Sequence, residues 1–463
     1  MTSGPPPENP RAPEMAGDFL GHPKGLSFLF ATEMWERFSF YGMRALLVLY
    51  MVKYLLRPGK VETVLGYGGF RHALEYVFGP LGLQPMASQI YGLYTGLVYL
   101  TPILGGLLAD RVLGQRRTVV IGALFMAAGH FMMAFEPLFL FALLALIIGN
   151  GAFKPNISTQ LGRLYAPGDP RRDRAYSIFY VGINIGAFFS PLVCGTLGEE
   201  AGWRYGFGAA GIGMLIGLAI YLRALRLLPP DPPLPAAPFA SSPRKLDRAE
   251  RRAVIAIMLL CLPLVFFWAG YEQQGNTIAL WADASTDRSI GLFAWSGTIP
   301  TTWFQAFNPF MIFAFTPFIV ALWRAQARRG REPSTIRKMA LGCFCLGAGN
   351  LVMMAAAWHL GAGEKASWLW LLGYFAIVTT GELYLSPTGL SLVTKVAPIP
   401  IVGIMMGLWL ATDFAGSFVA GWLGSFWSGM AKAHFFALIA AIAFIAGLVV
   451  WTFERPLRPI LKD

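Results

Sequence analysis

Residues 228–250 read LPPDPPLPAAPFASSPRKLDRAE, in which seven prolines are followed by a run of charges. A Pro-rich segment without an apolar run is typical of an exposed linker. The sequence on both sides is very different, because the whole chain is 56% hydrophobic and only 13% charged. Typical soluble proteins carry about 25% charged residues. The composition therefore indicates a polytopic membrane protein and excludes a disordered chain, a coiled coil and a disulfide scaffold.

Twelve apolar stretches are long enough to cross a bilayer, which requires about 20 mostly apolar residues. Before the linker they lie at 26–55, 86–109, 117–135, 138–162, 173–197 and 203–226. After the linker they lie at 252–281, 304–324, 337–359, 367–394, 402–424 and 431–453. The predicted fold class is an all-α membrane protein, with 12 transmembrane helices in two six-helix halves.

The domain organisation follows from these spans. We predict a cytoplasmic N-terminal tail (1–25), an N-terminal six-helix half (26–227) and a Pro-rich cytoplasmic linker (228–250). A C-terminal six-helix half (251–453) and a cytoplasmic C-terminal tail (454–463) follow. Most of the 37 Lys and Arg residues fall in the loops on the side of the termini. Positively charged loops stay in the cytoplasm, so the net charge of +12 is explained without nucleic acid.

Eight charged side chains lie in the interior of the predicted spans, away from the charges near their ends. Each costs about 2.5–3.5 kcal/mol at the centre of a bilayer, so they are expected to face a hydrated cavity or one another. They are Glu33, Glu36, Arg37 and Arg44 in the first span, Lys154 in the fourth, Glu272 in the seventh, Glu382 in the tenth and Asp413 in the eleventh.

The charges of the first span follow helical spacing. Glu33 lies one turn from both Glu36 and Arg37. Two carboxylates this close favour protonation of one of them, whereas the neighbouring cation opposes it. The cluster is therefore suited to gain and lose a proton. The alternative is a static ion pair that only fixes helix packing, and four charges on one span make that alternative less favoured.

Lys154 and Glu382 occupy the middle of the fourth and tenth spans, which are counterparts in the two halves. A proline follows each of them, Pro155 and Pro387, and proline in a membrane helix permits bending beside a cavity. Opposite charges on equivalent helices can close and open a cavity between the halves. A permanent salt bridge is the alternative, and it would prevent alternating access.

The seventh span is the counterpart of the first, and we expect its Glu272 to pair with Arg44. Asp413 has no obvious partner and is either a helper carboxylate or a locally hydrogen-bonded group. The sequence has no HExxH motif, GxSxG motif or His-rich helix. We therefore expect no enzyme activity, no cofactor and no metal.

Residues 33–42, EMWERFSFYG, resemble the ExxERFxYYG motif of the proton-dependent oligopeptide transporter family of the major facilitator superfamily. Further matching segments follow in order: YLTPILGGLLADRVLG from Tyr99, GNGAFKPNIST around Lys154, FYVGINIGA around Asn184, EQQGN at Glu272, FNPF at Asn308 and GELYLSPTGLSLVTKVAP around Glu382. The resemblance covers nearly the whole chain. It implies the major facilitator fold, in which the substrate lies between two related halves.

The function implied by this resemblance is a proton-coupled symporter that imports di- and tripeptides, and peptide-like drugs, by alternating access. The substrate-binding residues that it implies are Arg37 and Lys154 for the peptide carboxylate, Glu382, Asn184 and Asn308 for the amine, and Tyr41, Tyr99 and Trp409 for the aromatic lining, with Arg44 beside them. The proton-coupling residues that it implies are Glu33, Glu36 and Glu272. The implied gate pairs are Arg44–Glu272 on the outside and Lys154–Glu382 on the inside.

The implied partners are di- and tripeptides, protons and membrane lipid. We expect a monomer in a bacterial inner membrane with both termini in the cytoplasm. Three features depart from the family pattern. Phe40 replaces a tyrosine, Gly92 replaces the histidine of mammalian relatives, and the linker is too short for the two extra helices of most bacterial members.

Three other functions compete with this interpretation. A related transporter could carry nitrate, a drug or a peptide-like antibiotic, although nitrate would leave Glu382 without a partner. A membrane-embedded enzyme would need a nucleophile with a base, or a metal cluster. A sensor that binds without transporting would not need the paired carboxylates.

Overall fold

The computed structural model describes residues 18–166, 168–231, 247–292, 295–361, 363–398 and 401–456. Twelve long helices form the bundle within these residues, which confirms the twelve predicted spans. Those of the N-terminal half are α1 (Lys24–Tyr50), α3 (Leu83–Leu108), α4 (Gln115–Met132), α5 (Phe139–Gly162), α6 (Arg171–Ser190) and α7 (Trp203–Ala224). Those of the C-terminal half are α8 (Arg248–Tyr271), α10 (Phe307–Arg328), α11 (Thr335–His359), α12 (Leu369–Val396), α13 (Val402–Gly424) and α14 (Lys432–Thr452).

Several long helices continue through short π or 3₁₀ turns. The π turns are η1 (Met51–Leu55) after α1, η3 (Ala109–Leu113) after α3, and η5 (Pro191–Gly195) and η6 (Leu197–Ala201) after α6. The 3₁₀ turns are η2 (Val61–Thr63), η4 (Glu136–Leu138), η7 (Glu272–Gly275) and η8 (Thr301–Ala306). The shorter helices are α2 (Tyr67–Phe78), in the long loop after α1, and α9 (Thr277–Ala284), which continues α8 beyond η7.

The strands are minor elements of the loops. β1 (Asp18–Phe19) and β2 (His22–Pro23) pair antiparallel, as do β4 (Ser289–Leu292) and β5 (Trp295–Thr298). β3 (Thr286–Asp287) and β6 (Ala366–Ser367) pair in parallel. The predicted linker residues 232–246, and the tail residues 1–17 and 457–463, lie outside the described part of the chain. The predicted domain bounds therefore stay predictions.

Ten helices of the described chain are long and apolar enough to span a membrane by hydropathy alone, and α1 and α4 are not among them. α1 falls short because five of its residues are charged, yet it lies between α6 and α7 and is buried along most of its length. α4 is only 18 residues long and begins with Arg116 and Arg117. It packs along α5 and α7, so both helices belong to the bundle.

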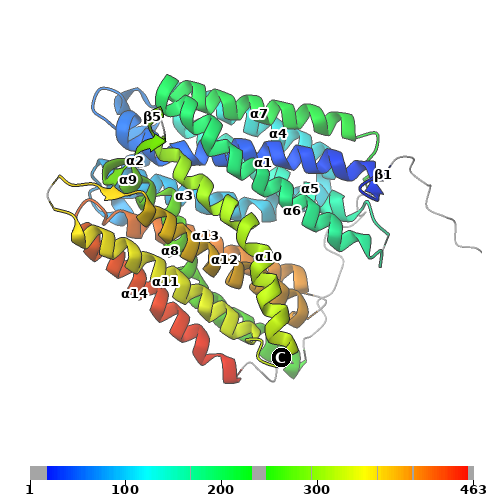
Figure 1. Ribbon diagram of the computed structural model, residues 1–463. Coiled ribbons are helices and arrows are strands. Elements are labelled where there is room, and N and C mark those ends of the chain that lie inside the picture. The colour runs from blue at the N-terminus through cyan, green and yellow to red at the C-terminus, as the bar shows by residue number, and fades with distance from the viewer. Residues whose placement is uncertain are drawn as a thin grey trace, which may run out of the picture.

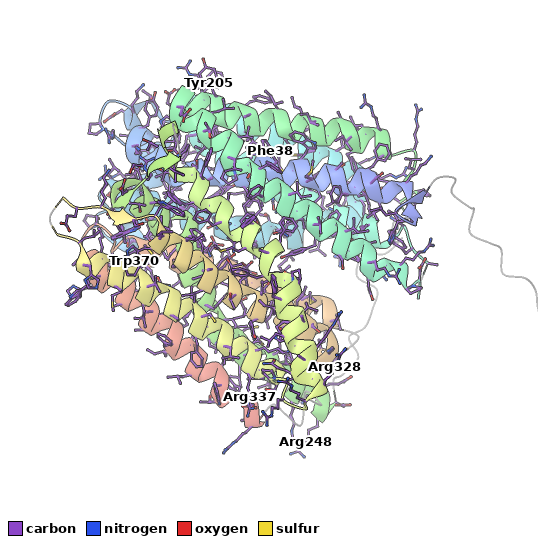
Figure 2. The ribbon with its side chains drawn as sticks, viewed as in Figure 1. Phe38, Tyr205, Arg248, Arg328, Arg337 and Trp370 are labelled. Carbon is purple, nitrogen blue, oxygen red and sulfur yellow. The ribbon has the colours of Figure 1, made fainter. Side chains whose placement is uncertain are left out.

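The two halves form two groups of helices (Figure 1). The main contacts between them are α3 along α13 and α6 against α10. Both β1 and the end of α14 lie at the same end of the bundle, and the groups spread apart toward that end (Figure 1). Arg248, Arg328 and Arg337 also lie there (Figure 2). The opposite end carries α2, α9 and β5 and is called the closed end below.

The α3–α13 contact explains Gly92. A Cβ atom at this position would lie 2.6 Å from the Gly421 Cα and 2.6 Å from the Ser417 carbonyl oxygen. Any side chain here would force the two helices apart, because real Cβ atoms do not approach backbone this closely. The absence of a histidine at residue 92 is therefore a requirement of the way the halves meet.

Candidate functional site

A cavity of about 310 Å³ lies between the two halves. Polar and aromatic side chains of both halves line it. The N-terminal half contributes Tyr41, Arg44, Tyr99, Lys154, Tyr180 and Asn184. The C-terminal half contributes Trp268, Tyr271, Gln305, Asn308, Phe375, Glu382, Trp409 and Asp413. Because both halves supply its walls, a relative movement of the halves changes the shape of this cavity.

The structure brings most of the predicted binding residues to this cavity, and the exception is Arg37. Its side chain is only 4% exposed and is not part of the cavity wall. The Arg37 Nε lies 3.1 Å from the Glu33 Oε1 and also contacts the Glu36 carboxylate. Arg37 therefore lies behind the wall formed by Tyr41, one helical turn further along α1.

Lys154 and Glu382 face the cavity from different halves and do not pair with each other within the described residues. The Lys154 Nζ lies 4.9 Å from the centre of the Tyr99 ring. The Glu382 Oε2 accepts a hydrogen bond of 2.8 Å from the Asn308 Nδ2. The predicted inner pair is thus open in this conformation, and the cavity presents one cation and one anion.

Several lining residues were not predicted from the sequence. Tyr271 lies beside Glu382 on the cavity wall, and Tyr180 lies one turn before Asn184 on α6. Tyr180 could have been predicted, because it lies four residues before Asn184 and therefore on the same face of the helix. Trp268 had no such signal, because tryptophan is also common on lipid-facing and packed helix surfaces.

The acidic cluster of α1 is enclosed by protein. Glu33 and Glu36 are 2% and 0% exposed, and the Asn150 Nδ2 of α5 donates to the Glu36 Oε1 at 3.3 Å. The Glu33 Oε2 and the Arg37 Nη2 have no hydrogen-bond partner among the described residues. Two carboxylates thus share one arginine, and this excess of buried negative charge is relieved when one carboxylate takes up a proton.

The predicted outer pair is formed at the far side of the cavity. The Arg44 Nη2 lies 2.5 Å from the Glu272 Oε2, and the Arg44 Nε donates to the Tyr91 hydroxyl at 2.8 Å. All three side chains are buried. Since Arg44 and Tyr91 belong to one half and Glu272 to the other, this contact ties the halves together above the cavity.

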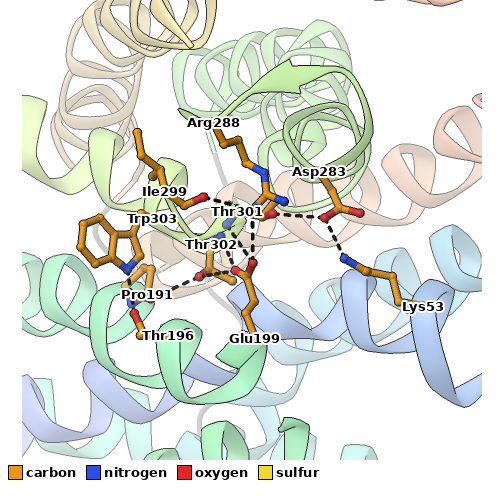
Figure 3. A network of polar contacts seen from close by, with 10 residues as sticks. All are labelled: Lys53, Pro191, Thr196, Glu199, Asp283, Arg288, Ile299, Thr301, Thr302 and Trp303. Carbon is orange, nitrogen blue, oxygen red and sulfur yellow. Dashed lines mark hydrogen bonds and ion pairs between the residues drawn. The ribbon is translucent and has the colours of Figure 1, made fainter. Parts of the chain in front are cut away.

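Further polar contacts join the halves at the closed end. The Ser88 Oγ donates to the Asn276 Oδ1 at 2.8 Å, and the Lys53 Nζ lies 2.8 Å from the Asp283 Oδ1. Figure 3 shows a further group of these contacts, around Glu199. These contacts close the cavity on this side.

Glu199 of η6 caps the helical turn η8 of the other half. Its carboxylate accepts hydrogen bonds from the Thr301 backbone N–H at 2.9 Å, the Thr302 backbone N–H at 2.8 Å and the Thr302 hydroxyl at 2.8 Å (Figure 3). The first N–H groups of a helix have no partner within the helix. The Arg288 Nη1 lies 3.7 Å away. Glu199 therefore provides, from the other half, the hydrogen-bond acceptors that the first N–H groups of η8 lack within their own helix.

Comparison with known proteins agrees with this geometry. The sequence model of the POT family matches residues 116–246 and 234–435. A di-/tripeptide transporter of Lactococcus lactis subsp. cremoris is 33% identical, with 96% of this chain and 98% of the relative covered. A peptide transporter of Yersinia enterocolitica subsp. palearctica is 35% identical over 88% of each chain.

Solved structures of POT family transporters are also similar to this chain. A peptide transporter POT in complex with sulfate superimposes with a TM-score of 0.82 at 31% identity, covering 96% of this chain and 97% of the other. A POT family transporter in complex with a thioalcohol-conjugated peptide gives a TM-score of 0.82 at 27% identity, covering 96% and 98%.

Proposed function

The chain belongs to the POT family, and from this premise we propose that it imports di- and tripeptides together with protons by alternating access. It is an integral membrane transporter and not an enzyme. The observation that carries the proposal is the cavity in which Lys154 and Glu382 face the same space without pairing. A peptide is a zwitterion, so one cation and one anion on separate walls match its two ends.

The binding roles follow from this complementarity. Lys154 binds the peptide carboxylate, and Glu382 binds the amine, supported by Asn308 and Asn184. The aromatic walls, Tyr41, Tyr99 and Trp409 among them, accept varied side chains by shape and dispersion. The volume of about 310 Å³ is at the lower end of the range of about 300–1,000 Å³ for small-molecule sites.

Arg37 joins the carboxylate site only after it is released. In the described conformation its charge is held by Glu33 and Glu36. Protonation of either acid removes half of the negative charge around Arg37, whose Nη2 already lacks a partner among the described residues. The freed guanidinium can then turn past Tyr41 toward the cavity, which links proton uptake to peptide binding.

Glu272 couples the proton to the outer closure. When Glu272 takes up a proton, its ion pair with Arg44 becomes an ordinary hydrogen bond, and the contact that ties the halves above the cavity weakens. The halves can then separate at the closed end while Lys154 and Glu382 approach each other. Once the halves have closed again at this end, the proton leaves to the inner side, and the Arg44–Glu272 ion pair of the described conformation forms again.

The topology completes the proposal. We place both termini in the cytoplasm of a bacterium and the protein in its inner membrane, as a monomer. The described conformation is then closed toward the outside. Peptide-like drugs with the same two terminal charges are additional substrates.

Uptake of labelled dialanine into proteoliposomes tests the proposal. We expect accumulation that requires an inward proton gradient and is abolished by a protonophore. Glu382→Gln should raise the KM for dialanine, because the amine loses its anion. The Glu36→Gln variant should lose gradient-driven uptake and retain counterflow. If neither dialanine nor other di- and tripeptides accumulate, the proposed substrate is wrong.

A further inference from the structure

A second carboxylate, that of Asp413, lines the cavity without a partner of its own. Its residue is 9% exposed, and within the described chain we find neither a hydrogen bond nor an ion pair to it. The expectation of a local hydrogen bond is therefore not met. A buried carboxylate without a partner is costly, so an unpaired acid on a cavity wall indicates that the partner arrives with the ligand.

We propose that Asp413 forms a side-chain subsite that selects peptides with a cationic side chain, such as Lys or Arg. This inference rests on the proposed peptide transport. It deepens that proposal, because the roles assigned above leave the side-chain preference open.

The charges on the cavity wall support the proposal. Among the described residues, four charged groups line the cavity: Arg44, Lys154, Glu382 and Asp413. Arg44 is compensated by its ion pair with Glu272. In the described conformation Arg37 is held by Glu33 and Glu36 outside the cavity wall, so the two ends of a peptide use Lys154 and Glu382, one charge each. One negative charge then remains, and a cationic peptide side chain is the group that compensates it.

The surroundings of Asp413 suit a long cation. Asp413 lies one helical turn after Trp409 on α13, and both side chains line the cavity. Tyr99 of α3 lies on the same cavity wall as Lys154, whose Nζ is 4.9 Å from the Tyr99 ring centre. A Lys or Arg side chain can combine an ion pair with contacts to aromatic faces, which attract cations.

Counterflow in proteoliposomes without a proton gradient isolates this subsite from proton coupling. The competitors of labelled dialanine are Ala-Lys and Ala-norleucine, which have similar side-chain length and differ in charge. In the unmodified protein we expect Ala-Lys to compete at about tenfold lower concentration, a factor that corresponds to about 1.4 kcal/mol. The Asp413→Asn variant should bring this ratio close to one.

Two further variants keep the experiment decisive. Asp413→Glu retains the charge and should keep the preference for Ala-Lys, which also separates charge from misfolding. Asp169→Asn makes the same chemical change on a carboxylate that pairs with Arg171 outside the cavity, and it should keep the ratio of the unmodified protein.

The contrary outcomes are distinct. If the unmodified protein does not prefer Ala-Lys, the subsite is refuted. If Asp413→Asn weakens both competitors equally, Asp413 serves as a counter-ion for Lys154 and the proposal is overturned. If dialanine shows no counterflow and no gradient-driven uptake at all, it is the proposed transport function that fails.

Discussion

Removal of the Glu199 carboxylate should open the closed end. Glu199 accepts three hydrogen bonds from Thr301 and Thr302 in the other half. Loss of a helix-capping side chain costs about 0.5–2 kcal/mol, and a hydrogen bond to a charged group makes a net contribution of about 1.5–3 kcal/mol. The ion pair with Arg288 is partly exposed and adds at most about 1 kcal/mol.

Water can reach the freed N–H groups when the halves separate. We therefore take about 2 kcal/mol, the upper value for a lost cap, as the amount by which Glu199→Ala raises the free energy of the closed conformation relative to the outward-open one. These contacts exist only while the halves meet at this end, so the loss falls on the closed conformation. A difference of 1.4 kcal/mol is a factor of ten in population. The ratio of outward-open to closed molecules should therefore rise about 30-fold.

Spin labels on Tyr205→Cys and Trp358→Cys report this change as a distance distribution. Both side chains are exposed, at 57% and 70%, and they belong to different halves. Glu200→Ala is the matched control, because Glu200 is the exposed neighbour of Glu199. If Glu199→Ala folds and its distance distribution equals that of the control, the carboxylate does not hold the closed end and the reasoning fails.

Two further changes test the packing and the acidic cluster. Gly92→Ala should lower the melting temperature of the detergent-solubilised protein, since its Cβ would meet Gly421 at 2.6 Å and overpacking costs about 1–3 kcal/mol. Gly208→Ala is the control. It should not lower the melting temperature, because no atom lies within 4 Å of the added Cβ. Asn150→Ala removes the donor to Glu36 and changes the balance between its charged and neutral forms by about 1 kcal/mol. We expect slower gradient-driven uptake at an unchanged rate of counterflow, and equal loss of both would contradict a role in coupling.

The spans were predictable because a bilayer imposes a length and a composition on any helix that crosses it. α1 is the informative case, since its charges remove it from a hydropathy count and only their helical spacing shows that they face one another. The end of α6 was less predictable. Two π turns, η5 from Pro191 and η6 from Leu197, extend the helix to Ala201, beyond the predicted limit of 197, and η6 places Glu199 against η8 of the other half.

The charged residues of the candidate site were predictable, because a charge inside a membrane helix is costly. The aromatic residues of the site were not predictable in this way, because they carry no such cost. Lys154 and Glu382 stand out in an apolar helix because lipid would not tolerate them. Arg37 shares this property, but spacing along α1 does not reveal that Glu33 and Glu36 hold it outside the cavity wall. Tyr271 gave no signal beyond being aromatic, and only the packing of α8 against its neighbours turns it toward Glu382.

The charged face of α1 also bears on how the protein is made. In lipid, its four charges would cost on the order of 10 kcal/mol, yet α1 leaves the ribosome before α6 and α7, which cover it in the finished bundle. Until residues 171–224 have been synthesised, the helix has no stable place in the bilayer. Assembly of the first half is therefore a checkpoint of biogenesis, and chains that stop before α7 should be recognised and degraded by membrane quality control.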